Sequence, residues 1–529
     1  MQKLMLASFA ILTAAALGGC VTPGGPQARN PIIWADVPDV SVIRVENTYY
    51  MSSTTMHMSP GLPIMKSDDL VNWELASYAY DTLVDNEAMN LQRGQNAYGK
   101  GSWASSLRYH EGRFYVSTFS DTSGKTHIFS TEDVTKSNWR EQSFEPVLHD
   151  HTLFFEEGRV YMVYGSGDIR LVELEDDLSG IKEGGINKVI IPDAGAVAGD
   201  DIMLPAEGSQ LYKVNGYYYL FNITWPQDDM RTVVIHRAEK LTGPYEGRVA
   251  LQDEGIAQGG LVQTPSGDWY AMLFGDRGAV GRIPYLVPVH WQDGWPVLGE
   301  NGTVPDRLNV PVENSNVSGL VQSDDFSTPT LPLAWQWNHN PHQEGWSLTD
   351  RPGHLRLTNH RLVDSVLQTR NTLTQRTFGP KSHVHTKLDV SGLRDGDVAG
   401  LLLLQKHYGY VGVKQENGQR SVVMVSAEKE GDASRELASH SVEQSILYLK
   451  AEADFRKQKD RAQFFYSLDG EQWTPIGEPL KMSYTLPHFM GYRFGLFNFA
   501  TETQGGTVDF DYFRIAPPQP IVEGPRLKQ

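Results

Sequence analysis

The chain has 529 residues, with 64 acidic and 46 basic side chains and a formal net charge of −18. This length exceeds what one hydrophobic core usually serves, so two or more domains are expected. The acidic balance excludes proteins that bind nucleic acid through a basic surface and suits a protein that acts on neutral ligands.

The first residues have the pattern of an export signal. Lys3 gives a positive start, and residues 4–17 are apolar and rich in small residues. Leu17-Gly18-Gly19-Cys20 then resembles the end of a bacterial lipoprotein signal, in which the cysteine is lipidated and becomes the N-terminus. The alternative is an ordinary secretory signal with an incidental cysteine.

We therefore expect a signal peptide over 1–19, lipidation of Cys20 and a tether over 20–29. No later segment is long and apolar enough for a transmembrane helix. The expected protein is an exported bacterial lipoprotein of the outer membrane, on its periplasmic or cell-surface face, held there only by its lipid. Cys20 is the only cysteine, so an intramolecular disulfide is excluded.

A hairpin pattern returns five times between residues 30 and 310. Each copy has strand-prone residues around a short turn and a tyrosine three residues after the turn residue. The turn residues are Asn47, Gly112, Gly158, Gly216 and Gly267, and the tyrosines are Tyr50, Tyr115, Tyr161, Tyr219 and Tyr270. The spacing is near that of four-stranded propeller blades. The pattern predicts a five-bladed β-propeller over 30–310; the alternative is an irregular β-sandwich with recurrent hairpins.

Eight or nine residues before the five turns stand Asp39, Trp103, Asp150, Glu207 and Gln258. In a propeller the first strand of every blade starts from the same rim of the central channel, so these side chains are expected to line one funnel. A single acid at such a position is most simply a solvated turn residue. Three acids at equivalent offsets indicate a catalytic group.

Three neighbouring carboxylates suit glycoside hydrolysis. This reaction needs one acid that protonates the leaving oxygen and one carboxylate that acts on the nucleophile. A third acid can raise the pKa of the proton donor and hold it in place. We assign Asp39 as the base, Asp150 as the residue that tunes the pKa, and Glu207 as the acid. The chemistry requires no redox or organic cofactor.

The pattern changes after residue 310. Residues 311–320 are expected to be a linker, and 321–517 contain longer alternating segments such as 383–390, with almost no helical periodicity. This predicts a two-sheet β-sandwich, so that the whole chain is all-β. Residues 518–529 are expected to be a tail.

These motifs together resemble glycoside hydrolase family 43. The residues that carry the resemblance are Pro38-Asp39-Val40-Ser41, Ser67-Asp68-Asp69-Leu70, Gly101-Ser102-Trp103-Ala104, His149-Asp150-His151, Ala206-Glu207-Gly208, Gly281-Arg282 and Gly294-Trp295-Pro296. The resemblance covers the whole mature chain, because the C-terminal part is similar to the concanavalin-like sandwich of the exo-acting pentosidases. It implies an inverting mechanism, an oligosaccharide substrate and the same three roles for the acids.

The resemblance also implies residues around the sugar. Trp103 would be a wall of the site and Arg282 a hydrogen-bonding partner of the pentose; the simpler alternatives are a core aromatic and a salt bridge within a blade. Met56 and His57 occupy a loop where relatives present aromatic residues, which is a departure. From the sandwich, Phe489 is the candidate to close the pocket.

Two possible metal sites follow from the same resemblance. Gln258 stands where relatives often have a histidine near a calcium or water cluster in the channel, and its amide oxygen can coordinate. Asp324 and Asp511 resemble a structural calcium pair, with two ordinary surface acids as the alternative.

The sequence thus predicts an exo-acting, inverting glycoside hydrolase that releases terminal α-L-arabinofuranose or β-D-xylose from plant cell-wall hemicellulose oligosaccharides. The departure at Met56 and His57 favours arabinofuranosides. The alternatives are a non-catalytic glycan-binding surface lipoprotein and a retaining, fructan-cleaving propeller glycosidase, which would need a covalent nucleophile.

Overall fold

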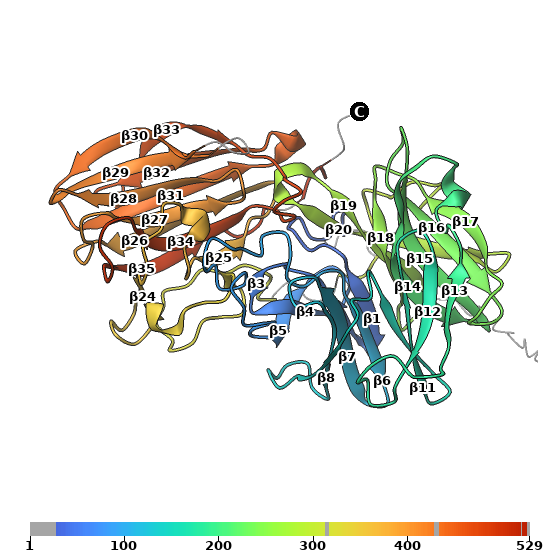
Figure 1. Cartoon of the computed structure of the whole chain (residues 1–529). Coiled ribbons are helices and arrows are strands. Elements are labelled where there is room, and N and C mark those ends of the chain that lie inside the picture. The colour runs from blue at the N-terminus through green and yellow to red at the C-terminus, as the bar shows by residue number, and fades with distance from the viewer. Residues whose placement is uncertain (1–27, 313–316, 428–432, 520, 526–529) are drawn as a thin grey trace, which may run out of the picture.

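The computed structural model describes residues 28–312, 317–427, 433–519 and 521–525, which fold into two β-units (Figure 1). The predicted signal peptide, Cys20 and most of the predicted tether lie outside the described residues. Across the described ranges, no helix has the length and apolar character needed to cross a membrane. The helical elements in these ranges are short 3₁₀ turns: η1 (Ala196–Ala198), η2 (Gly278–Val280), η3 (Gln343–Gly345), η4 (Val366–Gln368) and η5 (Arg456–Gln458).

The first unit consists of five four-stranded antiparallel sheets arranged as blades. The first three blades are β1 (Ser41–Val45), β2 (Thr48–Ser52), β4 (Gly61–Ser67) and β5 (Glu74–Tyr80); β6 (Ser106–His110), β7 (Arg113–Ser120), β8 (Lys125–Thr131) and β9 (Arg140–Phe144); and β10 (Thr152–Glu156), β11 (Arg159–Tyr164), β12 (Ile169–Leu174) and β13 (Asn187–Ile191). The last two are β14 (Ile202–Val214), β15 (Tyr217–Pro226), β16 (Thr232–Ala238) and β17 (Glu246–Leu251); and β18 (Ala257–Gln263), β19 (Trp269–Asp276), β20 (Arg282–Gln292) and β21 (Trp295–Leu298). The predicted five-bladed propeller is confirmed.

The repeated hairpins form the first two strands of each blade. The repeated tyrosine pairs with a residue of the first strand, as Tyr50 does with Ile43 and Tyr161 with Phe154. Aromatic rings then fill the space between blades, since Tyr50 of the first blade lies 5.0 Å from Phe114 of the second, centroid to centroid. The tyrosine that marks the repeat therefore belongs to the packing between sheets.

The first strands of the blades close into a ring. β1 contacts β6 and β18, and β10 and β14 complete the circle. Arg108 on β6 lies in the channel that the ring encloses and donates to Ser41 Oγ of the first blade at 3.4 Å and to Gln210 Oε1 of the fourth at 3.2 Å. Burial lowers the pKa of Arg108. The channel thus holds a partly buried cation whose donors reach acceptors of several blades.

The second unit is a sandwich of an eight-stranded and a seven-stranded sheet. The larger sheet contains β3 (Met58–Ser59), β22 (Gln336–Asn338), β25 (Leu373–Arg376), β34 (Arg493–Ala500), β27 (Asp397–Leu404), β28 (Gly409–Glu416), β29 (Gln419–Ser426) and β30 (Arg435–Val442). The smaller contains β23 (Trp346–Ser347), β24 (Leu355–Thr358), β35 (Thr507–Ile515), β26 (Lys381–Asp389), β31 (Ile446–Asp454), β32 (Arg461–Ser467) and β33 (Thr474–Lys481). The predicted two-sheet sandwich is confirmed.

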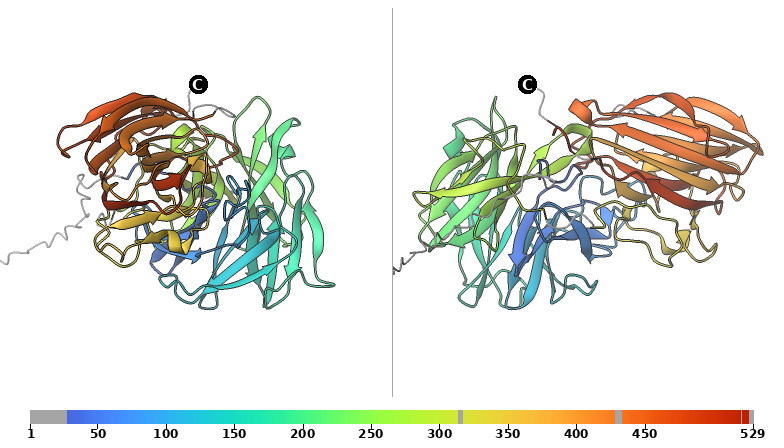
Figure 2. Two further views of the ribbon diagram at one scale, coloured as in Figure 1. Left: turned by 60° about the vertical axis from the view of Figure 1, so that its left-hand side comes forward. Right: turned by 180° about the vertical axis from the view of Figure 1, so that it is seen from behind.

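The two units share a sheet. β3 belongs to the sequence of the first propeller blade, but it pairs with β22 of the sandwich, Met58 opposite Asn338 and Ser59 opposite Trp337. Figure 2 shows the sandwich packed along one side of the propeller, next to the first blade. Backbone pairing therefore fixes the sandwich beside the rim of the propeller.

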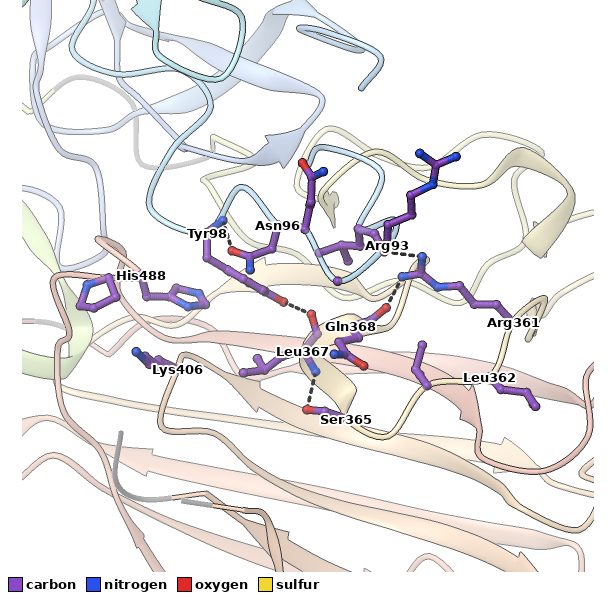
Figure 3. A pocket seen from close by; sticks show the side chains of 15 residues that line it. Arg93, Asn96, Tyr98, Arg361, Leu362, Ser365, Leu367, Gln368, Lys406 and His488 are labelled. Atoms are coloured by element: carbon purple, nitrogen blue, oxygen red, sulfur yellow. Dashed lines mark hydrogen bonds between the residues drawn. The ribbon is translucent and has the colours of Figure 1, made fainter. Parts of the chain in front are cut away.

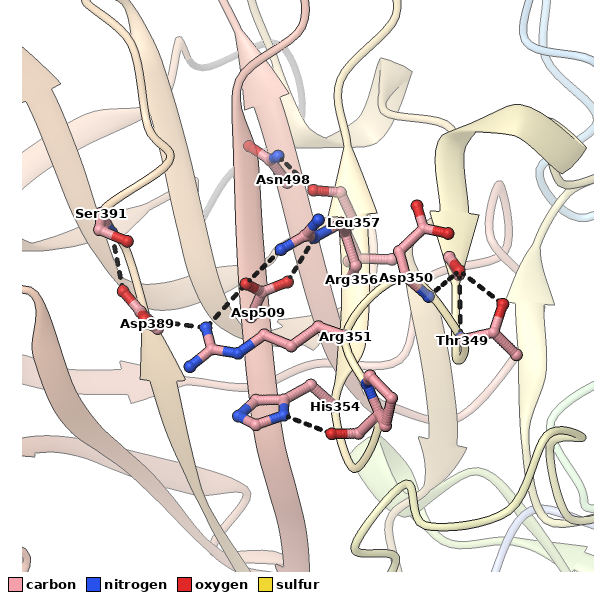
Figure 4. A network of polar contacts seen from close by, with 12 residues as sticks. Thr349, Asp350, Arg351, His354, Arg356, Leu357, Asp389, Ser391, Asn498 and Asp509 are labelled. Atoms are coloured by element: carbon pink, nitrogen blue, oxygen red, sulfur yellow. Dashed lines mark hydrogen bonds and ion pairs between the residues drawn. The ribbon is translucent and has the colours of Figure 1, made fainter.

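A group of ion pairs joins three strands of the smaller sheet (Figure 4). Asp509 on β35 accepts hydrogen bonds from Arg356 Nε at 2.7 Å and from Arg351 Nη1 at 2.8 Å, and Arg351 also reaches Asp389 on β26 at 2.8 Å. Burial alone would raise the pKa of Asp509, but the hydrogen bonds from the two arginines outweigh it and lower the pKa. The network stabilises the charged form of a carboxylate that is largely removed from water.

The two acids of the expected calcium pair have protein partners in this structure. Both carboxylate oxygens of Asp324 accept N–H donors, from Phe326 N at 2.8 Å and from Trp335 Nε1 at 2.8 Å, and Asp511 pairs with the Lys387 ammonium. A carboxylate oxygen that accepts one hydrogen bond keeps a second lone pair. The calcium pair therefore stays a prediction.

Candidate active site

The structure brings the three predicted acids together at the rim of the propeller channel. Asp39 and Asp150 lie two residues before the first strands of their blades and are 4% and 6% exposed, and Glu207 lies within β14 with its side chain 21% exposed. Burial raises the pKa of both aspartates, and the negative charge of Glu207 adds to the rise. Residues that are far apart in sequence thus form one acidic group.

The same backbone turn presents side chains in three blades. Asp39, Asp150 and Gln258 have φ angles of 53°, 47° and 54°. This left-handed region disfavours most side chains and is entered more readily by aspartate. In the fourth blade Gly208, next to Glu207, has a φ of 68°, and a Cβ there would lie 2.8 Å from the Gln258 side chain. The blades therefore share a left-handed backbone conformation at or next to the repeated position, as well as a sequence pattern.

Arg282 on β20 forms a buried ion pair with Asp39. Its Nη1 lies 2.9 Å from Asp39 Oδ1, and the arginine is 5% exposed. Burial raises the pKa of Asp39, while the guanidinium opposes that rise. Nε and Nη2 of Arg282 are buried and have no hydrogen-bond partner among the described residues. Arg282 is thus a salt-bridge partner that still has donors to offer to a bound molecule.

His149 connects the other two acids. Its Nε2 lies 3.0 Å from Glu207 Oε2 and 3.9 Å from Asp150 Oδ1. Burial raises the pKa of Asp150 to about 7, with the charge of His149 opposing and that of Glu207 adding to the rise. The ligand atoms of the three residues lie within 4.8 Å of one another. Because the imidazole and Glu207 are directly hydrogen-bonded, we interpret the group as a proton-sharing cluster rather than as a set of metal ligands.

A loop of the sandwich covers this site. The Phe489 ring lies 5.1 Å from that of Trp103 and 4.7 Å from the guanidinium carbon of Arg282. Tyr484 from the same loop has a buried hydroxyl with no hydrogen-bond partner in the described chain, and burial raises its pKa to about 12. Trp103 also stacks on Phe119, and its Nε1 is buried and unpartnered in the same sense. Phe489, the residue that we expected to close the pocket, therefore brings the sandwich next to Trp103 and to the arginine that pairs with Asp39.

Arg231 and Trp225 were not expected from the sequence. The charge of Arg231 interacts with those of Asp39 and Glu207, its guanidinium carbon lies 5.0 Å from the Trp225 ring, and it pairs with Asp276. Trp225 lies near the end of β15 and Arg231 in the turn after it, and β14 and β15, with 13 and 10 residues, are longer than the other first and second strands. The other blades have no equivalent residues at the same distance from the hairpin turn, so the sequence repeat could not reveal Arg231 and Trp225. Tyr484 was missed for the same reason.

The structure corrects the expectation for Met56 and His57. Both are fully buried. His57 Nε2 lies 3.0 Å from Asn338 Oδ1, and its ring contacts those of Tyr98 and His339 at 4.8 and 4.5 Å. Because the adjoining β3 joins the sandwich sheet, these residues belong to the contact between the two units. They line no open sugar site.

Gln258 lies on the floor beneath the acids. It lines a cavity of about 10 Å³ together with Asp39, Asp150 and Gln210. Such a volume holds about one water molecule. Gln210 already accepts a hydrogen bond from the Arg108 guanidinium. The Arg108 guanidinium thus already supplies positive charge in the channel. The residues that line this cavity therefore give no support for a metal ion in the channel.

A much larger cavity, of about 500 Å³, lies behind the covering loop (Figure 3). It is lined from both units, and none of the three acids borders it. Tyr98 forms one wall, stacks on His488 at 4.8 Å and donates to the Leu367 carbonyl at 2.7 Å. Tyr98 thus packs against His488, the residue before Phe489. The cavity lies next to the candidate active site and is separate from it.

Comparisons with known proteins agree with the fold and the two-domain organisation. The model for glycosyl hydrolases family 43 matches residues 28–296, and that for the β-xylosidase C-terminal concanavalin A-like domain matches 323–516. The chain is 29% identical to a β-xylosidase of Formosa agariphila, over 92% of this chain and 89% of that one. It is 30% identical to a non-reducing end α-L-arabinofuranosidase of Bacteroides ovatus, over 74% of this chain and 77% of that one.

A solved structure described as a bifunctional GH43-CE protein of Bacteroides eggerthii is 57% identical, with a TM-score of 0.91. The match covers 93% of this chain but 64% of that one. The chain thus spans less than two thirds of the length of that relative.

Replacing Arg282 tests the electrostatic account of the site. Arg282→Met leaves Asp39 buried and unpaired, and we expect it to lower the free energy of unfolding at neutral pH by about 3–5 kcal/mol. The folded pKa of Asp39 is raised, so protonation favours the folded state and the loss should shrink as the pH falls towards 4. Thermal unfolding at pH 5 and pH 8 measures both effects.

The double variant Asp39→Asn/Arg282→Met should recover most of this loss, because it removes both charges. Arg113→Met breaks the surface pair with Glu132 and is the matched control, with an expected change below about 1 kcal/mol. Equal destabilisation by Arg282→Met at both pH values, with no recovery in the double variant, would contradict the account.

Proposed function

This chain belongs to glycosyl hydrolases family 43, and from that premise we propose that it is an exo-acting, inverting glycosidase that releases terminal pentoses. The substrates are α-L-arabinofuranosides, β-D-xylosides or both, in plant cell-wall hemicellulose oligosaccharides. The observation that carries the proposal is the meeting of Asp39, Asp150 and Glu207 with Arg282 at one rim, beneath Phe489 of the sandwich. The relatives include a β-xylosidase of Formosa agariphila and an α-L-arabinofuranosidase of Bacteroides ovatus, which supports the two sugars.

Each acid has a separate role in this proposal. Asp39 is the base: the ion pair with Arg282 favours its charged form, which takes a proton from water as the water oxygen bonds to the anomeric carbon. Glu207 is the acid: its proton passes to the glycosidic oxygen as the bond from carbon to that oxygen breaks. Asp150 adjusts the charge around Glu207, with its own pKa near neutrality.

Unpartnered donors give the site its affinity for hydroxyl groups. Nε and Nη2 of Arg282, Nε1 of Trp103 and the hydroxyl of Tyr484 are buried beside the acids without partners in the described chain. A buried donor without an acceptor costs about 1–3 kcal/mol, and a sugar hydroxyl removes that cost. The aromatic rings of Trp103 and Phe489 supply the apolar surface that pyranose and furanose rings pack against.

The covering loop supports exo action. Phe489 and Tyr484 come from the sandwich and close one side of the rim, as a pocket for a chain end requires. The other side, beyond Glu207, carries Trp225 and Arg231, where the rest of the oligosaccharide leaves. The preference for arabinofuranosides rested on Met56 and His57, which are buried in the domain contact. The proposal therefore keeps both pentoses.

The substrate proposal is tested with matched chromogenic glycosides. Release from 4-nitrophenyl α-L-arabinofuranoside or β-D-xyloside should exceed release from the β-D-glucoside about 10–200-fold, since one extra group in a closed pocket costs about 1–3 kcal/mol. Proton NMR of the first-formed sugar should show the anomer opposite to that of the substrate. Retention of configuration would remove the role given to Asp39.

The role of Glu207 is tested by leaving-group dependence. Glu207→Gln should reduce kcat/KM about 10²–10⁴-fold on xylooligosaccharides or arabinosylated oligosaccharides, whose leaving groups need protonation. The loss on 2,4-dinitrophenyl glycosides should stay below about tenfold. Glu246→Gln, at a glutamate of the same blade that pairs with Arg237, is the matched control and should leave both rates unchanged. Equal losses on both substrates would count against Glu207 as the acid.

We also propose that the protein is an exported lipoprotein anchored at the outer membrane through Cys20. The motif Leu17-Gly18-Gly19-Cys20 supports this. Cys20→Ser should move the protein from the membrane fraction to the soluble fraction, because no other anchor is expected in the sequence. Thr22→Ser is the control, and unchanged membrane association of Cys20→Ser would overturn the proposal.

A further inference from the structure

His149 is placed to act on the proton of Glu207. It lies in the segment before β10, and its backbone carbonyl accepts a hydrogen bond from Gly165 N at 3.0 Å. Its ring lies edge-on to Phe119 at 5.1 Å, and its Nε2 is 3.0 Å from Glu207 Oε2. The side chain is 44% exposed, so it also meets solvent. Backbone and aromatic contacts thus hold a solvent-accessible imidazole against the proposed acid.

The strongest charge interactions of His149 are with acids, while the neighbouring His151 and, beyond Glu207, Arg231 are the other titratable or charged groups of the cluster. Glu207 approaches from β14, Asp150 from its own segment and Asp121 from the turn after β7, while Phe119 is the uncharged contact. Burial alone would lower the pKa of His149, but the hydrogen bond to Glu207 and the charges of Asp150, Glu207 and Asp121 outweigh it. They raise this pKa to about 9. At neutral pH the imidazole is therefore protonated and donates to the Glu207 carboxylate.

In this arrangement the proton that the leaving group needs lies on His149 and not on Glu207. On the basis of the function proposed above, we propose that His149 is a positioning residue that shares one proton with Glu207, so that the pair serves as the proton donor. The pair with one proton has two forms: charged His149 with ionised Glu207, and neutral His149 with protonated Glu207. The second form is the reactive one.

The proton balance of the cycle is complete. In the reactive form Glu207 gives its proton to the glycosidic oxygen, which leaves with the electron pair of the broken bond. The pair then holds neutral His149 and ionised Glu207, one proton short. Meanwhile Asp39 has taken one proton from the attacking water and returns it to solvent. His149 is half exposed, so it regains a proton from solvent and restores the pair.

Sharing changes the pH dependence of the reaction. While the pair holds one proton, the ratio of its two forms does not depend on pH. The alkaline fall of activity is then governed by loss of the shared proton, which His149 retains to a pH near 9. Without the histidine, no second group retains the shared proton, so the alkaline fall of activity should begin at a lower pH. His149 thus extends the working range of the acid towards alkaline pH.

Histidine and asparagine variants test this with matched controls. His149→Asn keeps a hydrogen-bond donor but carries no titratable proton, and its alkaline limb of kcat/KM should fall at least one pH unit lower than that of the wild type. His149→Lys keeps both the charge and a titratable proton and should retain the alkaline limb. His110→Asn is the control for exposure and ring contact, since His110 is 34% exposed and stacks on Phe155 at 4.5 Å. It should leave the profile unchanged.

A substrate-free measurement separates this inference from the proposed function. In an NMR titration of the full-length protein, the His149 imidazole should titrate near pH 9, and Glu207→Gln should move its pKa at least one unit towards the ordinary value of about 6.5. If this pKa is unaffected by Glu207→Gln, or if His149→Asn keeps the wild-type alkaline limb, the sharing of the proton is disproved. If instead Glu207→Gln fails the leaving-group test above, the proposed function itself fails.

Discussion

Closure of five sheets around one axis is the constraint on which the rest of this structure depends. Each blade must start its first strand at the inner ring, so the residues just before those strands meet at one rim. Asp39 and Asp150 reach that rim through the same left-handed turn, and Glu207 reaches it from within β14. The ring also encloses a polar channel, and Arg108 fills it by donating to residues of other blades. The acids therefore converge because of topology and not because of any contact among themselves.

Such convergence is costly, because like charges are buried side by side. A buried carboxylate without a partner is strongly unfavourable, and each added neighbour raises the cost. Here two cations offset this cost: Arg282 from the fifth blade pairs with Asp39, and His149 pairs with Glu207. Neither cation stands at a repeat position that carries an acid. Each holds its acid in a different state, since the permanent charge of an arginine favours a carboxylate, while a histidine can exchange a proton with one. That difference matches the needs of a base and an acid.

The parts of this account that recur in the sequence were predictable from it. Five hairpins with a tyrosine at one offset gave the blades, and the residues at the shared offset gave the acids, Trp103 and Gln258. Residues that depend on a single tertiary contact were not predictable. Tyr484 and Arg231 occupy loops without counterparts in other blades, and Met56 and His57 are buried because β3 crosses to another sheet.

The sandwich is part of the site and not only an appendage to it. Phe489 lies against both Trp103 and Arg282, which come from the second and fifth blades, so one loop bridges the rim above the acids. The position of that loop depends on the shared sheet of β3 and β22 and on the stacking of Tyr98 on His488. Removing water from the rim strengthens the charge interactions buried beneath it, above all the pair of Arg282 with Asp39. The contact between the two units therefore sets the electrostatics of Asp39 as well as the shape of the pocket, and the cavity of about 500 Å³ lies behind the loop rather than above the acids.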